Sequence, residues 1–207
     1  MIAKKILYWY DNNKRSLPWR VNCTSIKKEY LTIVSEFMLQ QTQVATVIPY
    51  FNNFLRHIPN MASLAKVKEE KLLKYWQGLG YYSRAKNLKK SAKMIVANHN
   101  GRLPNNFLEL KKLPGVGDYT ASAISAIVFN EQIIPLDGNI ERVLKRILNL
   151  KTEKEIKKEN LHKRKKIFGQ TSRSSDYAQA LMEIGALLCK PKNPYCEKCP
   201  ITKNCLS

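Results

Sequence analysis

Apolar residues recur every three or four positions along most of this chain, as they do when one face of a helix packs against a core. No convincing stretch alternates apolar and polar residues between hairpin turns, as paired β-strands do. The spacing predicts helices over residues 2–12, 28–42, 44–57, 61–66, 69–76, 81–97, 105–112, 118–130, 139–149, 153–170 and 175–188. The fold class indicated is therefore all-α.

The length of the chain and its lack of long apolar runs limit its class. A chain of 207 residues can bury one substantial core, or two small lobes that share an interface. The longest apolar run, near residues 123–129, is far too short to cross a bilayer, and no secretory signal peptide is present. We therefore expect a cytoplasmic protein without a membrane partner, whose thiols stay reduced.

Four cysteines near the end of the chain have the spacing C-x6-C-x2-C-x5-C: Cys189, Cys196, Cys199 and Cys205. Turn-forming residues separate them, so this segment can wrap around an inorganic centre. Zinc sites usually pair two short C-x2-4-C knuckles, whereas only one is present here. An iron–sulfur cluster fits the unequal spacing better, and a pair of disulfides is disfavoured in a reducing compartment. Cys23 lies apart and is expected to be a plain thiol.

The formal charge of +20 is the second broad feature of the sequence. Such a surplus of Lys and Arg favours a polyanionic partner such as nucleic acid. Most of these residues are lysine and the chain is also rich in Asn and Ile, so a nucleotide bias of the genome is a competing explanation. The charged run over 151–166 is interpreted as a solvated helical face. Charge alone therefore leaves the function open.

A glycine-rich turn, LPGVG at 113–117, joins two predicted helices. Gly115 and Gly117 let the backbone turn tightly on either side of Val116, so that N–H groups and the next helix N-terminus face outward and can hold a phosphate. The turn resembles a helix-hairpin-helix. A simple interhelical turn is the alternative, and phosphate contacts would position the protein without defining its reaction.

Two carboxylates are candidates for chemistry. Asp137 follows an apolar stretch and opens a predicted helix, where it could simply be an N-cap. Glu36 lies among apolar residues of a predicted helix and shares a face with Gln40. A buried Glu has a raised pKa and can hold a proton near neutral pH. Cleavage of a glycosidic bond uses one protonated carboxyl group, which donates a proton to the leaving group, and one ionised carboxylate, which stabilises positive charge on the sugar. Release of a nucleobase from deoxyribose needs the same two groups.

The order of the motifs resembles that of the MutY-type adenine DNA glycosylases. These motifs are LPWR at 17–20, SEFMLQQTQV at 35–44, GLGYY at 78–82, LPGVG at 113–117, LDGN at 136–139 and the cysteine segment. That family belongs to the helix-hairpin-helix superfamily, which includes endonuclease III. The resemblance extends from about residue 5 to 205. It implies a six-helix lobe with the hairpin over 22–132, and a lobe with the iron–sulfur loop formed by 1–21 plus 133–207.

The resemblance implies a role for each catalytic candidate. Glu36 would protonate the adenine ring and help activate water, and Asp137 would stabilise the oxocarbenium-like sugar, with Asn139 orienting it. Tyr119 stands where bifunctional relatives carry a nucleophilic lysine. Because tyrosine cannot form a Schiff base, the enzyme is expected to be monofunctional.

Further residues are assigned by the same resemblance, because a base inside a duplex must be flipped into a pocket. The adenine pocket would be lined by Trp19, Arg20, Leu39 and Glu183. DNA would be contacted by Gln40, Gln41, Tyr81, Gly115, Val116, Gly117 and Lys198, with Gln41 and Tyr81 wedged into the stack. The four cysteines would hold a 4Fe-4S cluster that shapes a DNA-contacting loop.

The partner implied is double-stranded DNA with A·8-oxoguanine or A·G mispairs, bound by a monomer. Family members continue into a Nudix-like domain that recognises 8-oxoguanine. Since the sequence ends at Ser207, we expect adenine excision with a weakened preference for 8-oxoguanine over guanine.

Three other functions compete with adenine excision. A thymine glycosylase acting on T·G mismatches also has tyrosine at the position of Tyr119, although the MLQQTQ run at 38–43 argues against it. An endonuclease III-like enzyme is disfavoured because the lysine is missing. In a non-catalytic iron–sulfur DNA-binding module, Glu36 would be an internal polar contact and Asp137 a helix cap.

Overall fold

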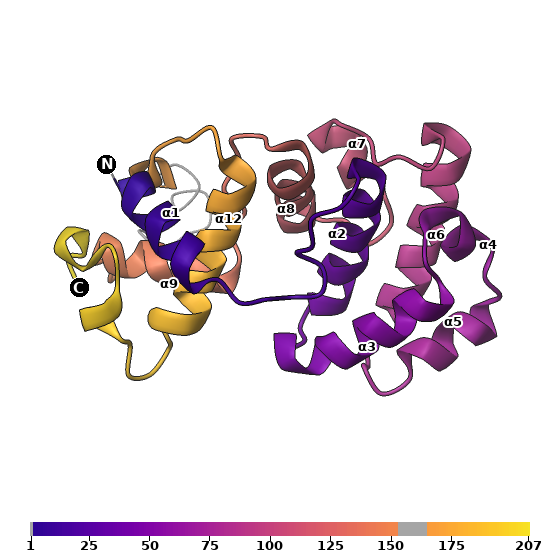
Figure 1. The fold of residues 1–207 in the computed structure, drawn as a ribbon, viewed down its shortest axis with the longest axis horizontal. Coiled ribbons are helices and arrows are strands. Elements are labelled where there is room, and N and C mark those ends of the chain that lie inside the picture. Colours follow the sequence, from indigo (N-terminus) through magenta and orange to yellow (C-terminus); the bar gives the residue numbers. More distant parts are fainter. Residues whose placement is uncertain (1, 153–164) are drawn as a thin grey trace. The chain divides into compact units, whose positions relative to one another are not determined.

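The structure is a computed structural model that describes residues 2–152 and 165–207 (Figure 1). Every regular element in these two stretches is helical and no strand occurs in them, which confirms the all-α prediction. The chain divides into two compact units. We call residues 16–128 the central unit, and residues 1–15 with 129–207 the terminal unit. The predicted domains, 22–132 and 1–21 plus 133–207, differ from these bounds by a few residues and stay a prediction.

The central unit is a bundle of helices around α2. Its elements are α2 (Ser25–Leu39), α3 (Val44–His57), α4 (Met61–Lys66), α5 (Glu69–Trp76), α6 (Tyr82–His99), α7 (Phe107–Lys111) and α8 (Asp118–Phe129). Helices α3 and α6 pack against α2, and α4 and α5 pack against α6. These are seven helices, one more than the six-helix lobe that the resemblance implies.

Helix α2 is buried on all sides over most of its length, from Glu29 to Met38. A charged group on such a helix is stable only when it is paired, because burying an unpaired charge is costly. Glu29 is paired in this way. Its carboxylate accepts hydrogen bonds from Arg102 Nε at 2.9 Å and from the backbone N–H of Leu103 at 2.7 Å. The second carboxylate of the buried stretch is Glu36.

The terminal unit joins the start of the chain to its end. Its helices are α1 (Ile2–Asn13), α9 (Gly138–Ile147) and α12 (Ser174–Glu183), and α12 continues into a π-helical turn, η2 (Ile184–Leu188). Short 3-10 turns occur at η1 (Lys165–Phe168), η3 (Cys196–Lys198) and η4 (Thr202–Asn204). Both α1 and α9 pack against α12. Their apolar faces form one core, and three cysteines, Cys189, Cys199 and Cys205, pack against it.

Most predicted helix bounds agree with the structure to within two or three residues. Helix α2 starts earlier than predicted because Thr24 caps it, with Oγ1 accepting from the Lys27 N–H at 3.4 Å. It ends at Leu39 because Gln41 adopts a φ of 56°. The predicted helix over 153–170 lies mostly outside the described residues, and its described end is η1. None of the described helices is long and apolar enough to cross a membrane.

Candidate active site

Glu36 lies in the buried stretch of α2 and is only 6% exposed. One helical turn later, Gln40 ties the end of α2 to the glycine-rich turn. Its side-chain amide donates to the carbonyl oxygen of Gly115 at 3.2 Å and to Thr120 Oγ1 at 3.4 Å. The amide of Gln40 is therefore engaged within the central unit, and the predicted DNA contact of Gln40 stays a prediction.

The turn at 113–117 is held so that its backbone, rather than its side chains, is available. Gly115 has a φ of 82°, and a Cβ on it would approach Phe37 Cε1 to 2.8 Å. No other residue fits there without a shift. The side chain of Val116 is buried while Gly117 is exposed. Val116 could therefore contact a phosphate only through its backbone, and helix α8 begins directly after the turn.

Three residues assigned to the adenine pocket, Trp19, Arg20 and Leu39, are half-buried in the central unit. The ring of Trp19 packs edge-on against Phe51 of α3, with the ring centroids 5.2 Å apart. Trp19 thus has a core-packing role whatever else it does. Tyr119 is also half-buried, in the first turn of α8.

Asp137 is the N-cap of α9, and its carboxylate is held at both oxygens. Oδ1 accepts from the backbone N–H of Ile140 at 2.7 Å, and Oδ2 accepts from the side-chain amide of Asn139 at 2.9 Å. Burial raises the pKa of Asp137, although these hydrogen bonds and the nearby charge of Arg142 act in the opposite direction. The cap predicted as an alternative role is present, and it leaves the carboxylate half-buried and oriented.

Arg142 fixes the residue that orients Asp137. Its Nη2 donates to Asn139 Oδ1 at 2.8 Å and to the carbonyl oxygen of Gly185 at 2.7 Å, and its Nε donates to the carbonyl oxygen of Cys189 at 2.7 Å. Because the guanidinium holds the amide oxygen, the amide nitrogen of Asn139 must face Asp137. One arginine therefore connects the carboxylate to the start of the cysteine segment.

The π-helical turn after α12 brings its backbone against Asn139. A Cβ built on Gly185 would lie 2.6 Å from Asn139 Cβ and 3.0 Å from its carbonyl carbon. Neither Gly185 nor Arg142 was predicted from the sequence. The spacing of Asn139 and Arg142, one helical turn apart, was the only local signal for this cluster.

Glu183, assigned to the adenine pocket, is completely buried at the end of α12. Arg15 binds it with two side-chain hydrogen bonds, from Nε to Oε2 at 2.8 Å and from Nη2 to Oε1 at 2.7 Å. This two-point geometry is the strong form of an ion pair. Glu183 therefore anchors the segment after α1 to α12, and its contact with adenine stays a prediction.

The four clustered cysteines form no disulfide bond in the structure and line one cavity of about 260 Å³. The disulfide alternative is thus not found in this segment. Arg146 of α9 donates to Cys189 Sγ at 3.4 Å and to the carbonyl oxygen of Lys190 at 2.6 Å. Nowhere in 2–152 or 165–207 do three or more His, Cys, Asp or Glu side chains form a group that could hold a single metal ion. The cluster predicted from the spacing is therefore not confirmed.

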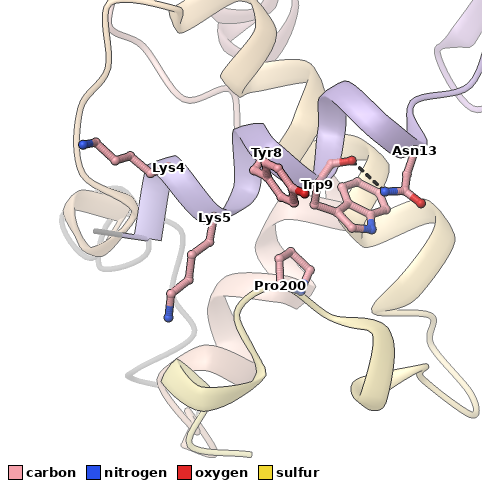
Figure 2. A pocket seen from close by; sticks show the side chains of 6 residues that line it. All are labelled: Lys4, Lys5, Tyr8, Trp9, Asn13 and Pro200. Atoms are coloured by element: carbon pink, nitrogen blue, oxygen red, sulfur yellow. Dashed lines mark hydrogen bonds between the residues drawn. The ribbon is translucent and has the colours of Figure 1, made fainter.

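Basic and aromatic side chains surround the cysteine segment. The ammonium groups of Lys190 and Lys198 lie 4.6 and 5.9 Å from the ring centroid of the half-exposed Tyr195. Lys198 is exposed. A separate hollow of about 520 Å³ on the terminal unit is shown in Figure 2, and none of its residues was singled out from the sequence: Lys4, Lys5, Tyr8, Trp9, Asn13 and Pro200.

The geometry thus gathers the predicted residues into two groups, one in each unit. Glu36, Gln40 and the glycine-rich turn belong to the central unit, while Asp137, Asn139 and the cysteines belong to the terminal unit. A family model described as HhH-GPD superfamily base excision DNA repair protein matches residues 34–167. The chain belongs to this superfamily.

Curated HhH-GPD relatives and solved structures resemble nearly the whole chain. An adenine DNA glycosylase of Buchnera aphidicola subsp. Baizongia pistaciae is 41% identical over 98% of this chain, and the human adenine DNA glycosylase is 38% identical over 97%. The chain spans 57% of the length of the first relative and 38% of the second.

Among solved structures, a thermostable thymine-DNA glycosylase matches with a TM-score of 0.85 at 25% identity, covering 99% of this chain and 93% of its own. An endonuclease III trapped with DNA as a covalent intermediate matches with a TM-score of 0.77 at 21% identity, covering 99% and 92%. The second likeness concerns the fold alone.

Proposed function

We propose that this protein is a monofunctional adenine DNA glycosylase that removes adenine mispaired with 8-oxoguanine or guanine in double-stranded DNA, and that it acts as a monomer in the cytoplasm. The observation that carries the proposal is the oriented carboxylate of Asp137, which accepts from Asn139, itself held by Arg142. The proposal is also supported by sequence similarity, because nearly the whole of this chain is similar to proteins named adenine DNA glycosylases.

In the proposed reaction, the bond between the sugar C1′ and adenine N9 breaks and its electron pair goes to the base. Glu36 supplies a proton to the adenine ring, so the base leaves as a neutral molecule. The sugar becomes positively charged, and the oriented carboxylate of Asp137 stabilises that charge. Water then bonds to C1′ and returns its proton to Glu36.

Desolvation strengthens this electrostatic role. A carboxylate that is half-buried and held by directed hydrogen bonds does not have to reorganise when positive charge develops. Tyr119 supports the monofunctional assignment, because a phenol cannot form the Schiff base needed for strand cleavage at the sugar. The phosphates beside the lesion would be held by the backbone of the turn at 113–117, next to the N-terminus of α8.

The four cysteines fit a 4Fe-4S cluster because the donor set is all sulfur and lines one cavity. When bound, it would hold the loop that carries Lys198 in shape. Arg146, which donates to Cys189 Sγ, would offset part of the negative charge of the thiolates.

The test is single-turnover base release from duplexes containing A·8-oxoguanine, A·G or T·G. Release of adenine by the wild-type chain and at least a ~100-fold loss in Glu36→Gln are expected, since proton donation contributes about 10²–10⁴-fold. Glu70→Gln, a change at an exposed position of α5, is the matched control. Binding without base release would overturn the proposal.

Thymine excision from T·G is the second candidate, because a thymine-DNA glycosylase structure matches the fold of this chain with a TM-score of 0.85 at 25% identity. Release of thymine in place of adenine in the same assay would favour it.

A further inference from the structure

Two residues of the central unit have an unusual backbone conformation. Among the described residues, those other than glycine with positive φ are Gln41, Tyr81, Asn100, Asn130, Asn149 and Asn193. Asparagine adopts this left-handed region readily, whereas glutamine and tyrosine do so rarely. Gln41 and Tyr81, at φ values of 56° and 46°, are therefore the exceptions. Both are exposed, and Tyr81 is 60% exposed. Such conformations persist only where surrounding contacts enforce them.

The chain segments on which both residues lie are bound by one buried guanidinium, that of Arg84 in the first turn of α6. Its Nη1 reaches the segment around Gln41, and its Nη2 reaches the segment before Tyr81. The acceptors are the carbonyl oxygens of Phe37 at 3.3 Å, Met38 at 2.8 Å, Gln40, Leu79 at 3.1 Å and Gly80 at 3.2 Å, and Thr42 Oγ1 at 3.1 Å.

Aromatic rings complete the enclosure of Arg84. The guanidinium carbon lies 5.3 Å from the ring centroid of Tyr81 and 5.7 Å from that of Trp76. The indole N–H of Trp76 also donates to the carbonyl oxygen of Gly80 at 3.1 Å. Tyr81 is thus held through its ring, through the preceding backbone, and through its own carbonyl, which accepts from the Arg84 N–H at 2.9 Å.

We infer that Arg84 is a positioning residue that fixes Gln41 and Tyr81 as two prongs of one rigid DNA wedge. The inference rests on the proposed function, which requires that a base be flipped and that the gap be kept from closing. A planar guanidinium with five directed donors can bind carbonyls of two segments at once, whereas a lysine ammonium on a flexible stem cannot. Loss of the guanidinium lets each prong relax independently.

The test uses Arg84→Lys, which keeps the positive charge and loses the forked guanidinium, and Thr42→Val, which removes one acceptor at a half-buried position. Arg102→Lys is the matched control, since Arg102 binds Glu29 in the same unit. Base flipping is measured as the fluorescence rise of 2-aminopurine placed beside the adenine of an A·G mispair, in a Glu36→Gln background. Single-turnover adenine release is measured in the same variants without that background change.

We expect a folded Arg84→Lys protein to lose at least half of the fluorescence rise and to release adenine about tenfold more slowly, because small misplacements at a reacting site cost up to ~100-fold. Thr42→Val should move both quantities in the same direction by about twofold. Arg102→Lys should leave both unchanged.

The inference is overturned if Arg84→Lys shows the same fluorescence rise as the protein with Arg84, whether or not adenine release is slower. If Arg84→Lys does not fold, Thr42→Val decides, and an unchanged fluorescence rise in that variant has the same meaning. The two proposals fail separately. Absence of adenine release from the wild-type chain overturns the proposed function, whereas the fluorescence signal requires no base release.

Discussion

A single methyl group at Gly185 should disable the carboxylate of Asp137 without touching it. In Gly185→Ala the new Cβ would lie 2.6 Å from Asn139 Cβ, where ordinary contacts begin at about 3.4 Å. The difference, 3.4 minus 2.6, is about 0.8 Å and must be absorbed by movement. The nearest atoms are the Cβ, carbonyl carbon and Cα of Asn139, at the start of α9. Because none of these is the end of a flexible side chain, the backbone of Asn139 must take up most of the shift.

Both stability and rate should respond to that shift. Overpacking of a well-filled interior costs about 1–3 kcal/mol, so the free energy of unfolding should fall by roughly that amount. A displacement of about 1 Å at a catalytic group lowers the rate by about 100-fold. Because Asn139 donates directly to Asp137 at 2.9 Å, most of the displacement should reach the carboxylate. We expect adenine release to fall by roughly 30- to 100-fold.

The assay is single-turnover adenine release from an A·G duplex at saturating enzyme, with thermal unfolding followed on the same preparation. Gly138→Ala is the control, since a Cβ on Gly138 would meet nothing within 4 Å although that residue adjoins Asp137. It should unfold and react like wild type. A folded Gly185→Ala protein that releases adenine within threefold of the wild-type rate would refute the reasoning.

Three further predictions follow from the terminal unit. Arg15→Ala should lower the free energy of unfolding by about 2–3 kcal/mol, because it leaves the buried carboxylate of Glu183 unpaired. This value is below the roughly 3–5 kcal/mol that breaking a fully buried pair costs, because the Arg15 side chain is 32% exposed. Chemical denaturation measures this, and an effect as small as that of Lys86→Ala in an exposed pair would contradict it. Asp137→Asn should stabilise the fold at neutral pH. Because burial raises the pKa of Asp137, the contribution of this carboxyl to stability is fully present below its unfolded pKa and is lost as the pH rises through its folded pKa. The stability gained by Asp137→Asn should therefore vanish in denaturation curves taken below about pH 4. A difference between the two proteins that does not change with pH would exclude burial of the charge as its cause. Cys196→Ser should lose iron and visible absorption in the purified protein, and retention of both would show that Cys196 is not a ligand.

Much of the candidate site was predictable because its signals are local. The helical spacing around Glu36 predicted the helix that the structure has as α2, although it left the burial of Glu36 open. The position of Asp137 after an apolar stretch indicated the N-cap as one of its two roles. The spacing of the cysteines predicted a segment that gathers around one centre, and the four thiols do line one cavity. Each of these features depends on residues within a few turns of one another.

Other assignments depended on contacts that no local pattern records. Val116 was assigned to DNA contact, but its side chain is buried, so only its backbone is available. Gln40 uses its amide to bind the turn at 113–117, and Glu183 is paired with Arg15 across 168 residues of sequence. A hydrophobic period cannot distinguish a side chain that faces the core from one that faces a ligand.

The sequence by itself determined the helices, the two candidate carboxylates and the cysteine segment, because periodicity, capping and ligand spacing act over short stretches of chain. Only the tertiary structure decided how those groups are held. Arg142 reaches Cys189, and Arg84 reaches the end of α2, each across 47 residues. Directed hydrogen bonds and close backbone approaches between distant segments exist only after the helices have packed, so they leave no trace in the local pattern.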